Sequence, residues 1–279
     1  MRNTALLTSL AMIAFAANSV LCRLALGDGH IDAASFASVR VISGALALAI
    51  IVLYRSAGPV PRDADWRAAL ALFVYMVLFS FAYLSLSAGT GALVLFGAVQ
   101  LTMFVVALRS GEAFNAISWA GLMLAIAGLV YLVSPGITAP DPIGAILMAV
   151  AGIAWGIYSL LGRRATDPTR ATAWNFLLSV PLVVVTSLIF MEQFHATPFG
   201  LVLAAASGVV ASGIGYVTWY AALRGLAATS AATVQLSVPV IAAIGGVILL
   251  SEDVTLRLLI ASATTLGGVA IVLMQRRVR

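Results

Sequence analysis

One stretch of the sequence occurs twice, 140 residues apart, as Ile13–Arg23 and Ile153–Arg163. The copies share Ile, Ala, Ser, Leu and Arg at corresponding positions, and the third position is aromatic in both, as Phe15 and Trp155. The same offset pairs identical residues further along: Ala92 with Ala232, Val94 with Val234, Glu112 with Glu252 and Gly128 with Gly268. A repeat of this length decides the architecture. The sequence therefore predicts two homologous halves, residues 1–134 and 142–279, joined by a proline-rich linker at 135–141.

The composition is that of a protein that crosses a membrane many times. Hydrophobic residues make up 62% of the chain and charged residues 9%, whereas about 25% of the residues in a soluble domain are charged. The apolar segments are continuous rather than alternating, which predicts helices rather than the strands of a barrel. With roughly 20 apolar residues per span, the sequence predicts an all-α polytopic membrane protein with ten transmembrane helices, at 4–22, 34–54, 67–87, 90–108, 114–133, 142–161, 172–191, 199–222, 228–250 and 255–275.

Arginine alone carries the net charge of +5, because the chain has no lysine. Basic chains often bind nucleic acid, but these arginines lie in short loops between spans, where they indicate topology. With the N-terminus inside, twelve arginines lie on the inner side, Arg23 and Arg257 lie on the outer side, and Arg40 falls within a span. Both termini are therefore predicted to be cytoplasmic, and no nucleic-acid partner is expected.

Five spans per half is an odd number, so the second half must enter the membrane with the opposite orientation. Glu112 and Glu252 illustrate this, because they correspond in the repeat yet fall in an inner and an outer loop. Two inverted five-helix repeats are typical of transporters that work by alternating access, with the substrate site near the midplane between the halves.

Short motifs follow one another in a fixed order along the chain. They are Asn18-Ser19 before Arg23, Arg40 early in the second span, Ala154–Ser159 before Arg163-Arg164, Tyr220–Leu226, and Pro239 thirteen residues before Glu252. Their order and spacing, with the five-plus-five plan, resemble the EamA-type members of the drug/metabolite transporter superfamily. The resemblance covers essentially the whole chain and extends to the YddG-type aromatic amino acid exporters.

The resemblance implies a multi-pass carrier in the inner membrane of a bacterium that exports small metabolites, among them neutral and aromatic amino acids. The implied partners are the small-molecule substrate and the lipid bilayer, and no cofactor is implied. One departure is visible, because Val99 stands where the second half has Pro239. The halves are therefore not expected to bend alike, and Pro239, which removes a helix hydrogen bond, is the expected hinge.

No Asp, Glu or His falls inside a predicted span, and His30 and His195 fall in outer loops. Buried ionisable residues are the usual elements of proton relays in membranes, so tight proton coupling through a carboxylate is not expected. The same absence leaves no general acid/base pair or metal cluster at membrane depth. Cys22 is the only cysteine, which excludes an intrachain disulfide. An enzyme and a metal site are not expected.

Arg40 is the one charged residue that lies more than a helical turn inside a predicted span, toward the outer end of that span. Its guanidinium is expected either to face the central cavity, where it would bind a carboxylate bidentately, or to reach the outer interface or the carbonyls of a helix end. The repeat partner is Val180, so the second half has no equivalent charge.

Polar and aromatic residues within the spans are the other candidates for the substrate site. An amide in hydrocarbon needs a partner, so it tends to face protein or a cavity, and the aromatics at i, i+4 and i+8 of the third span share one helix face. Core packing is the alternative for each aromatic residue. The expected cavity would suit neutral or zwitterionic metabolites. Arg40 joins its lining if the guanidinium faces the cavity. The other expected lining residues are Asn18, Tyr75, Phe79, Tyr83, Gln100, Trp155, Tyr158, Trp219 and Gln235.

Small residues spaced by four, which let helices approach closely, occur in spans five and ten. They are Gly121 with Ala125, and Ala263 with Gly267. These spans carry few polar residues, so they are expected to lie outside the transport path, either as a homodimer contact or as ordinary intramolecular packing.

Two transport mechanisms remain open from the sequence. The chain is either a secondary carrier that exports small metabolites by rocking of its two halves, or a passive facilitator on the same scaffold. The lack of Asp, Glu and His within the spans is compatible with either mechanism.

Overall fold

A computed structural model describes residues 2–55, 65–162, 165–226 and 228–275. The described chain is helical, and its only β-type pairing is an isolated bridge between Ile31 and Ala196. The first half contains α1 (Arg2–Gly27), α2 (Ala33–Arg55), α3 (Trp66–Ala82), α4 (Ala88–Arg109) and α5 (Ala116–Val133). The second contains α6 (Pro142–Gly162), α7 (Pro168–Ile189), η1 (Met191–Gln193), α8 (Pro198–Ala206), η2 (Ser207–Ile214), α9 (Gly215–Leu223), α10 (Ala228–Gln235), α11 (Ser237–Leu250) and α12 (Leu256–Gln275).

Nine helical stretches of the described chain are long and apolar enough to cross a membrane, and α3 is a shorter apolar helix of 17 residues. Two of the nine are compound, since α8, η2 and α9 run together as Pro198–Leu223, and α10 with α11 supplies Ala231–Leu250. The prediction of an all-α polytopic membrane protein is confirmed to this extent.

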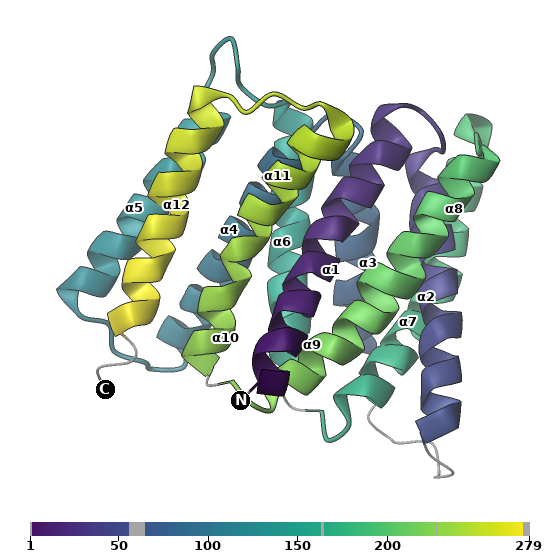
Figure 1. The fold of residues 1–279 in the computed structure, drawn as a ribbon, viewed down its shortest axis with the longest axis horizontal. Helices are drawn as coiled ribbons and strands as arrows, with labels where there is room; N and C mark the ends of the chain where they lie inside the picture. The colour runs from purple at the N-terminus through teal and green to yellow at the C-terminus, as the bar shows by residue number, and fades with distance from the viewer. Residues whose placement is uncertain (1, 56–64, 163–164, 227, 276–279) are drawn as a thin grey trace.

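The helices form a broad bundle in which the start of α1 and the end of α12 lie on one face (Figure 1). We call this the terminal face; α4 and α6 end there, at Arg109 and Gly162. The opposite face carries the end of α1 and the start of α4 at Ala88. Across the bundle, α5 and α12 pair at one edge, α4 packs against α11, α6 packs against α3 and α4, and α1 packs against α8, η2, α9 and α11. At the other edge α2 packs against α7 and η2.

The ends of two spans differ from the prediction for identifiable reasons. The third span was expected to reach residue 87, but α3 ends at Ala82 because the chain turns there and Ser87 caps α4 by accepting a hydrogen bond from the Thr90 amide. The first span was expected to end at residue 22, but α1 continues to Gly27. Arg23 is therefore a helical residue, and its guanidinium reaches neighbouring helices.

The expected bend in span nine coincides with a break between α10 and α11 at Leu236. Pro239 has no amide proton to donate to the Gln235 carbonyl, which is the last residue of α10. The proline therefore accounts for the break. Its role as a hinge stays a prediction.

Spans five and ten pack against each other within the chain. A Cβ atom on Gly121 would lie 2.7 Å from the Gly268 carbonyl oxygen, and one on Gly268 would lie 2.5 Å from the Ala125 amide nitrogen. A Cβ on Gly267 would meet nothing within 4 Å. The Gly121–Ala125 pair thus serves intramolecular packing, whereas the part of α12 around Gly267 is open, and a homodimer stays a prediction.

Candidate functional site

Four aromatic rings meet in the middle of the bundle, each from a different helix. They are Phe15 on α1, Tyr75 on α3, Trp155 on α6 and Tyr216 on α9. Ring centroids are 4.8 Å apart for Tyr75 and Trp155, 5.1 Å for Trp155 and Tyr216, and 6.0 Å for Phe15 and Tyr216. Such tilted and edge-to-face pairs are the favoured geometries. The rings line a small central cavity of about 10 Å³, which is room for about one water molecule.

An aromatic series extends from this cavity toward the opposite face along α3. Phe79 lies 5.4 Å from Tyr75, and Tyr83 lies 4.8 Å from Phe79. Tyr83 follows the last residue of α3, and its hydroxyl donates to the Ala88 carbonyl at 3.3 Å. Phe79 therefore lines the central cavity, whereas Tyr83 is fully buried beyond it, where α3 ends and α4 begins.

A buried polar network joins four elements beside these rings. The Tyr75 hydroxyl accepts from Arg40 Nη2 at 3.0 Å and from Asn18 Nδ2 at 3.3 Å. Ser207 donates to Asn18 Oδ1 at 2.6 Å, and Arg40 Nε donates to the Ser212 hydroxyl at 3.2 Å. The network thus ties α1, α2, α3 and η2 together at the depth of the cavity.

The Arg40 side chain is fully buried, with 0% of its surface exposed. Its guanidinium carbon lies 4.9 Å from the ring centre of Phe79 and 5.3 Å from that of Tyr75. The guanidinium therefore lies inside the bundle, and the expected alternative of a side chain reaching the outer interface does not describe this structure. One nitrogen, Nη1, has no hydrogen-bond partner among the described residues.

The π-helical segment η2 supplies the serines of the network. Ser207 and Ser212 bond to α1 and α2 from the same short segment. This requires close packing of η2 on α2, which Gly208 permits, since a Cβ there would collide with the Ser43 hydroxyl and the Arg40 carbonyl. Such π-helical segments frequently occur at functional sites.

A larger vestibule of about 370 Å³ lies between the central cavity and the terminal face. It is lined by the ends of α6 and α9, by the start of α7 and by the middle and end of α10. Trp155 and Tyr216 border both spaces and so separate them. Trp219 and Gln235 line the vestibule as well, and the ring of Tyr158 lies 5.4 Å from that of Trp155.

The opposite face is closed by a set of polar contacts around Arg23 and Glu252. Arg23 donates to the carbonyls of Tyr83 and Leu84 at 3.1 and 3.2 Å and pairs with Glu252 at 3.3 Å. Both carboxylate oxygens of Glu252 accept from the Ala88 amide, at 2.9 and 3.1 Å. We call these contacts the outer seal, because they join α1, α3 and α4 to the loop after α11.

Burial raises the pKa of the Glu252 carboxyl above its ordinary value, although the Ala88 amide and the Arg23 guanidinium both act to lower that pKa. Desolvation therefore outweighs the two favourable contacts. Replacing Glu252 by a neutral side chain should therefore destabilise the protein less than the loss of the ion pair with Arg23 alone would suggest.

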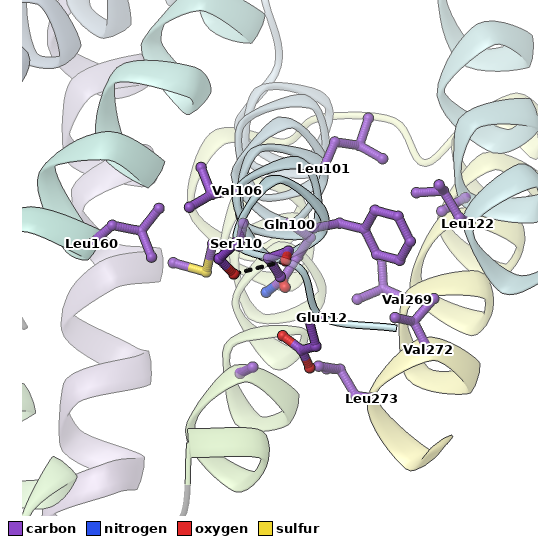
Figure 2. A pocket seen from close by; sticks show the side chains of 15 residues that line it. Gln100, Leu101, Val106, Ser110, Glu112, Leu122, Leu160, Val269, Val272 and Leu273 are labelled. Carbon is purple, nitrogen blue, oxygen red and sulfur yellow. Dashed lines mark hydrogen bonds between the residues drawn. The ribbon is translucent and has the colours of Figure 1, made fainter. Parts of the chain in front are cut away.

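Gln100 does not join the central cluster. It lines a lateral pocket of about 250 Å³ between α4, α5 and α12, together with mostly apolar side chains and with Ser110 and Glu112 (Figure 2). Its side-chain nitrogen is buried without a hydrogen-bond partner in the described chain. The expectation that Gln100 shares a cavity with the other candidates is therefore wrong for this structure.

The structure brings most of the other predicted residues together. Asn18, Arg40, Tyr75, Phe79, Trp155 and Tyr158 form the central cluster, Trp219 and Gln235 lie in the vestibule, and Tyr83 lies beyond Phe79. Sequence reasoning singled out Phe15 as the repeat partner of Trp155, but it did not select Tyr216, Ser207 or Ser212 for the site. Tyr216 precedes Trp219 by about one helical turn, so it carried a usable signal.

The described residues contain no group of three His, Cys, Asp or Glu side chains that could hold a metal ion. What the site offers chemically is aromatic faces, hydroxyls, one amide and one buried cation. Such groups bind and orient a small organic molecule.

Comparisons with known proteins agree with this architecture. The chain is 49% identical to an uncharacterized protein of Pseudomonas aeruginosa over 99% of its length and 96% of the relative's. It is 27% identical to an uncharacterized transporter of Archaeoglobus fulgidus, covering 95% and 96% of the two chains. A shorter match, 32% identical over 29% of this chain and 28% of the relative, is to the uncharacterized inner membrane transporter YedA of Escherichia coli.

A crystal structure of a protein with 22% sequence identity matches the fold with a TM-score of 0.68, covering 97% of this chain and 98% of that one. At this identity the match speaks for the fold alone. The sequence model of the EamA-like transporter family matches the chain twice, over residues 2–134 and 142–274. This membrane protein therefore belongs to the EamA-like transporter family.

Proposed function

We propose that the protein exports small neutral or zwitterionic metabolites, aromatic amino acids foremost, across the inner membrane of a bacterium by alternating access. The observation that carries this proposal is the central cavity. It draws Phe15 and Tyr75 from the first half of the chain and Trp155 and Tyr216 from the second. Aromatic walls with a few polar groups suit a small planar organic molecule.

The proposal includes two inverted halves, residues 1–134 and 142–279. The packing supports this, because the two halves make corresponding contacts. Helix α6 contacts α3 and α4. Its repeat counterpart α1 contacts α8–η2–α9, the counterpart of α3, and α11, the counterpart of α4. Repeat partners Gly111 and Ser251 also have the same unusual backbone, with φ of 84° and 52°. They follow α4 and α11, which end on opposite faces of the bundle.

We take the terminal face to be cytoplasmic. The helix ends at this face carry Arg67, Arg109, Arg170 and Arg224, whereas Arg23 and Arg257 lie near the opposite face. An excess of arginine marks the cytoplasmic side. In this orientation the structure is open inward through the vestibule and closed outward by the outer seal.

Alternating access would require the outer seal to open while the vestibule closes. The break at Leu236 between α10 and α11, beside Pro239, lies in a span that lines the vestibule through Gln235. A bend there would move the vestibule wall relative to α11, which leads to Glu252. This supports Pro239 as the hinge.

Facilitated diffusion is the second candidate function. The described spans contain no Asp or Glu, so they offer no carboxylate that could carry a proton through the membrane. A uniporter that cycles between the same two states without a coupling ion is compatible with this composition.

The test is flux of labelled L-phenylalanine into liposomes that contain only this protein, with and without a pH gradient. We expect saturable flux that Trp155→Ala reduces roughly 10-fold, equivalent to about 1.4 kcal/mol, while Trp119→Ala, at a residue that is 41% exposed on α5, leaves it unchanged. Absence of saturable flux would contradict the proposed substrate. Accumulation driven by the gradient would contradict the facilitator and require a coupling ion.

A further inference from the structure

The most unusual group in the cavity region is the Arg40 cation, because it is fully buried without a matching anion. Among the described residues, ion pairs are formed by Arg23 with Glu252 and by Arg170 with Asp167, and neither involves Arg40. The ionisable side chains that interact with it belong to Tyr75, Tyr216 and Cys22. Tyrosine and cysteine are ordinarily neutral at pH 7, so the charge is uncompensated within the described protein.

A buried charge without a counter-ion is strongly unfavourable. The contacts that Arg40 does make offset only part of this. Ser212 and Tyr75 accept two of its five N–H groups, and the faces of Phe79 and Tyr75 stabilise the cation through their π electrons. Three N–H groups remain, two of them on Nη1, which has no partner in the described chain.

The free N–H groups lie on the two terminal nitrogens of the guanidinium. Nη1 has both protons available, and Nη2 has one beyond the proton that it donates to Tyr75. Neighbouring guanidinium nitrogens are the groups that bind a carboxylate with two parallel hydrogen bonds. The Tyr216 hydroxyl, which interacts electrostatically with Arg40 and borders the cavity, is also buried without a partner in the described chain.

We infer that Arg40 is the recognition site for a carboxylate of the transported molecule, with the free guanidinium N–H groups and the Tyr216 hydroxyl as donors to it. The rings of Tyr75, Trp155 and Tyr216 contact the apolar part of the same molecule. The proposed substrates are then small aromatic carboxylates, which include the zwitterionic aromatic amino acids and extend to anions that lack the ammonium group. This inference rests on the proposed transport function.

The alternative is a purely structural Arg40 that cross-links α2, α3 and η2. A structural role would change stability without changing the preference among ligands, so ligand preference is the decisive measurement.

The experiment is calorimetric titration of the purified full chain at pH 7 with three probes of similar size. L-phenylalanine has a carboxylate and an ammonium group, 3-phenylpropionate has only the carboxylate, and 2-phenylethylamine has only the ammonium group. We expect the first two to bind roughly 10- to 100-fold more tightly than the third, as the loss of a charged hydrogen-bond pair implies. Arg40→Gln should abolish this difference and Arg40→Lys should retain part of it, while Arg109→Gln, an exposed arginine at the end of α4, should retain it fully.

If Arg40→Gln does not fold, titration of the unmodified protein still tests the inference. Equal binding of all three probes would overturn the carboxylate assignment and leave the proposed transport of aromatic metabolites standing. An unchanged preference in a folded Arg40→Gln would overturn it as well. Binding of none of the probes would overturn the proposed substrate class and this assignment with it.

Discussion

Tyr75 holds the polar groups of the central cluster together through a single hydroxyl. That oxygen accepts from Arg40 and from Asn18, while its ring stacks near Trp155 and Phe79. The side chain is buried, so both donors would lose their partner if the oxygen were removed. A buried donor left without an acceptor costs about 1–3 kcal/mol, and more if it is charged.

We therefore expect Tyr75→Phe to lower the free energy of unfolding by roughly 1–3 kcal/mol, although the ring is retained. The matched control is Tyr54→Phe, because the Tyr54 side chain is 90% exposed. Thermal unfolding in detergent, followed by tryptophan fluorescence, measures both. Equal midpoints for Tyr75→Phe and the unmodified protein would mean that the hydroxyl does not hold this network.

The sequence repeat made it possible to predict some of the residues that share a cavity. Phe15 and Trp155, or Asn18 and Tyr158, correspond in the two halves and therefore lie near the axis between them. Gln100 was misplaced because α4 is apolar on all sides, so the sequence pattern does not say which side faces the cavity. Ser207 and Ser212 had no sequence signal, since nothing in the pattern predicts a π-helical register.

At the level of elements, η2 is the segment on which the position of Arg40 depends. Because Gly208 has no side chain, η2 can lie against the α2 backbone at Arg40. On α2, Gly44 faces the Gly208 carbonyl, and a Cβ added to Gly44 would lie 3.1 Å from that oxygen. A side chain at Gly208 would push η2 and α2 apart and so separate Ser212 from the guanidinium.

Gly208→Ala should therefore destabilise the protein by about 1–3 kcal/mol, the usual result of overpacking, and reduce phenylalanine flux. Gly267→Ala is the matched control, because a Cβ there meets nothing within 4 Å and Ala favours a helix over Gly by roughly 0.5–1 kcal/mol. The unfolding midpoints should shift in opposite directions. A Gly208→Ala protein as stable as the Gly267→Ala protein would contradict the close packing of η2 on α2.

The outer seal is the second element with a testable role. Cys22 precedes Arg23, is fully buried, and is the only cysteine of the chain, so its reaction with a maleimide reports opening at this face. Arg23→Gln removes the ion pair and two carbonyl contacts and leaves the Glu252 carboxylate half-buried without its cation. We expect labelling of Cys22 to accelerate several-fold, since breaking a partly buried pair from one side is unfavourable.

Glu252→Gln should accelerate the labelling less than Arg23→Gln. Burial already raises the pKa of the Glu252 carboxyl, so a neutral side chain fits this position, and its oxygen can still accept from the Ala88 amide. Arg257→Gln is the control on the same face, because Arg257 donates to the carbonyls of Leu132 and Ser134 instead. If all three variants label at the rate of the unmodified protein, the contacts of Arg23 do not close this face.

Element boundaries were predictable where local chemistry marks them. Asp65, Ser87, Asn115 and Asp167 cap the helices that follow them, as short polar residues do, and Pro239 marks the break beside it. The early end of α3 and the extension of α1 to Gly27 were not predictable. At these two ends Arg23 of α1 donates to the Tyr83 and Leu84 carbonyls that follow α3, and a contact between residues so far apart in the sequence leaves no local signal.

At the scale of the whole molecule, the helical membrane architecture followed from composition and from the length of the apolar segments. The orientation in the membrane is a separate matter, because a bundle with chemically similar faces is positioned only by the arginines at its helix ends. Repeat partners Ala113 and Asp253 provide a direct test, since both are exposed and they follow helices that end on opposite faces.

We expect an impermeant maleimide added to intact cells to label Asp253→Cys and not Ala113→Cys, each made with Cys22→Ala. The reason is that α4 ends at the terminal face, which we take to be cytoplasmic, whereas the loop after α11 joins the outer seal through Glu252. Labelling of Ala113→Cys alone would reverse the orientation and keep the inverted halves. Labelling of both from outside would contradict the inversion itself, because repeat partners on one side of the membrane require halves of the same orientation.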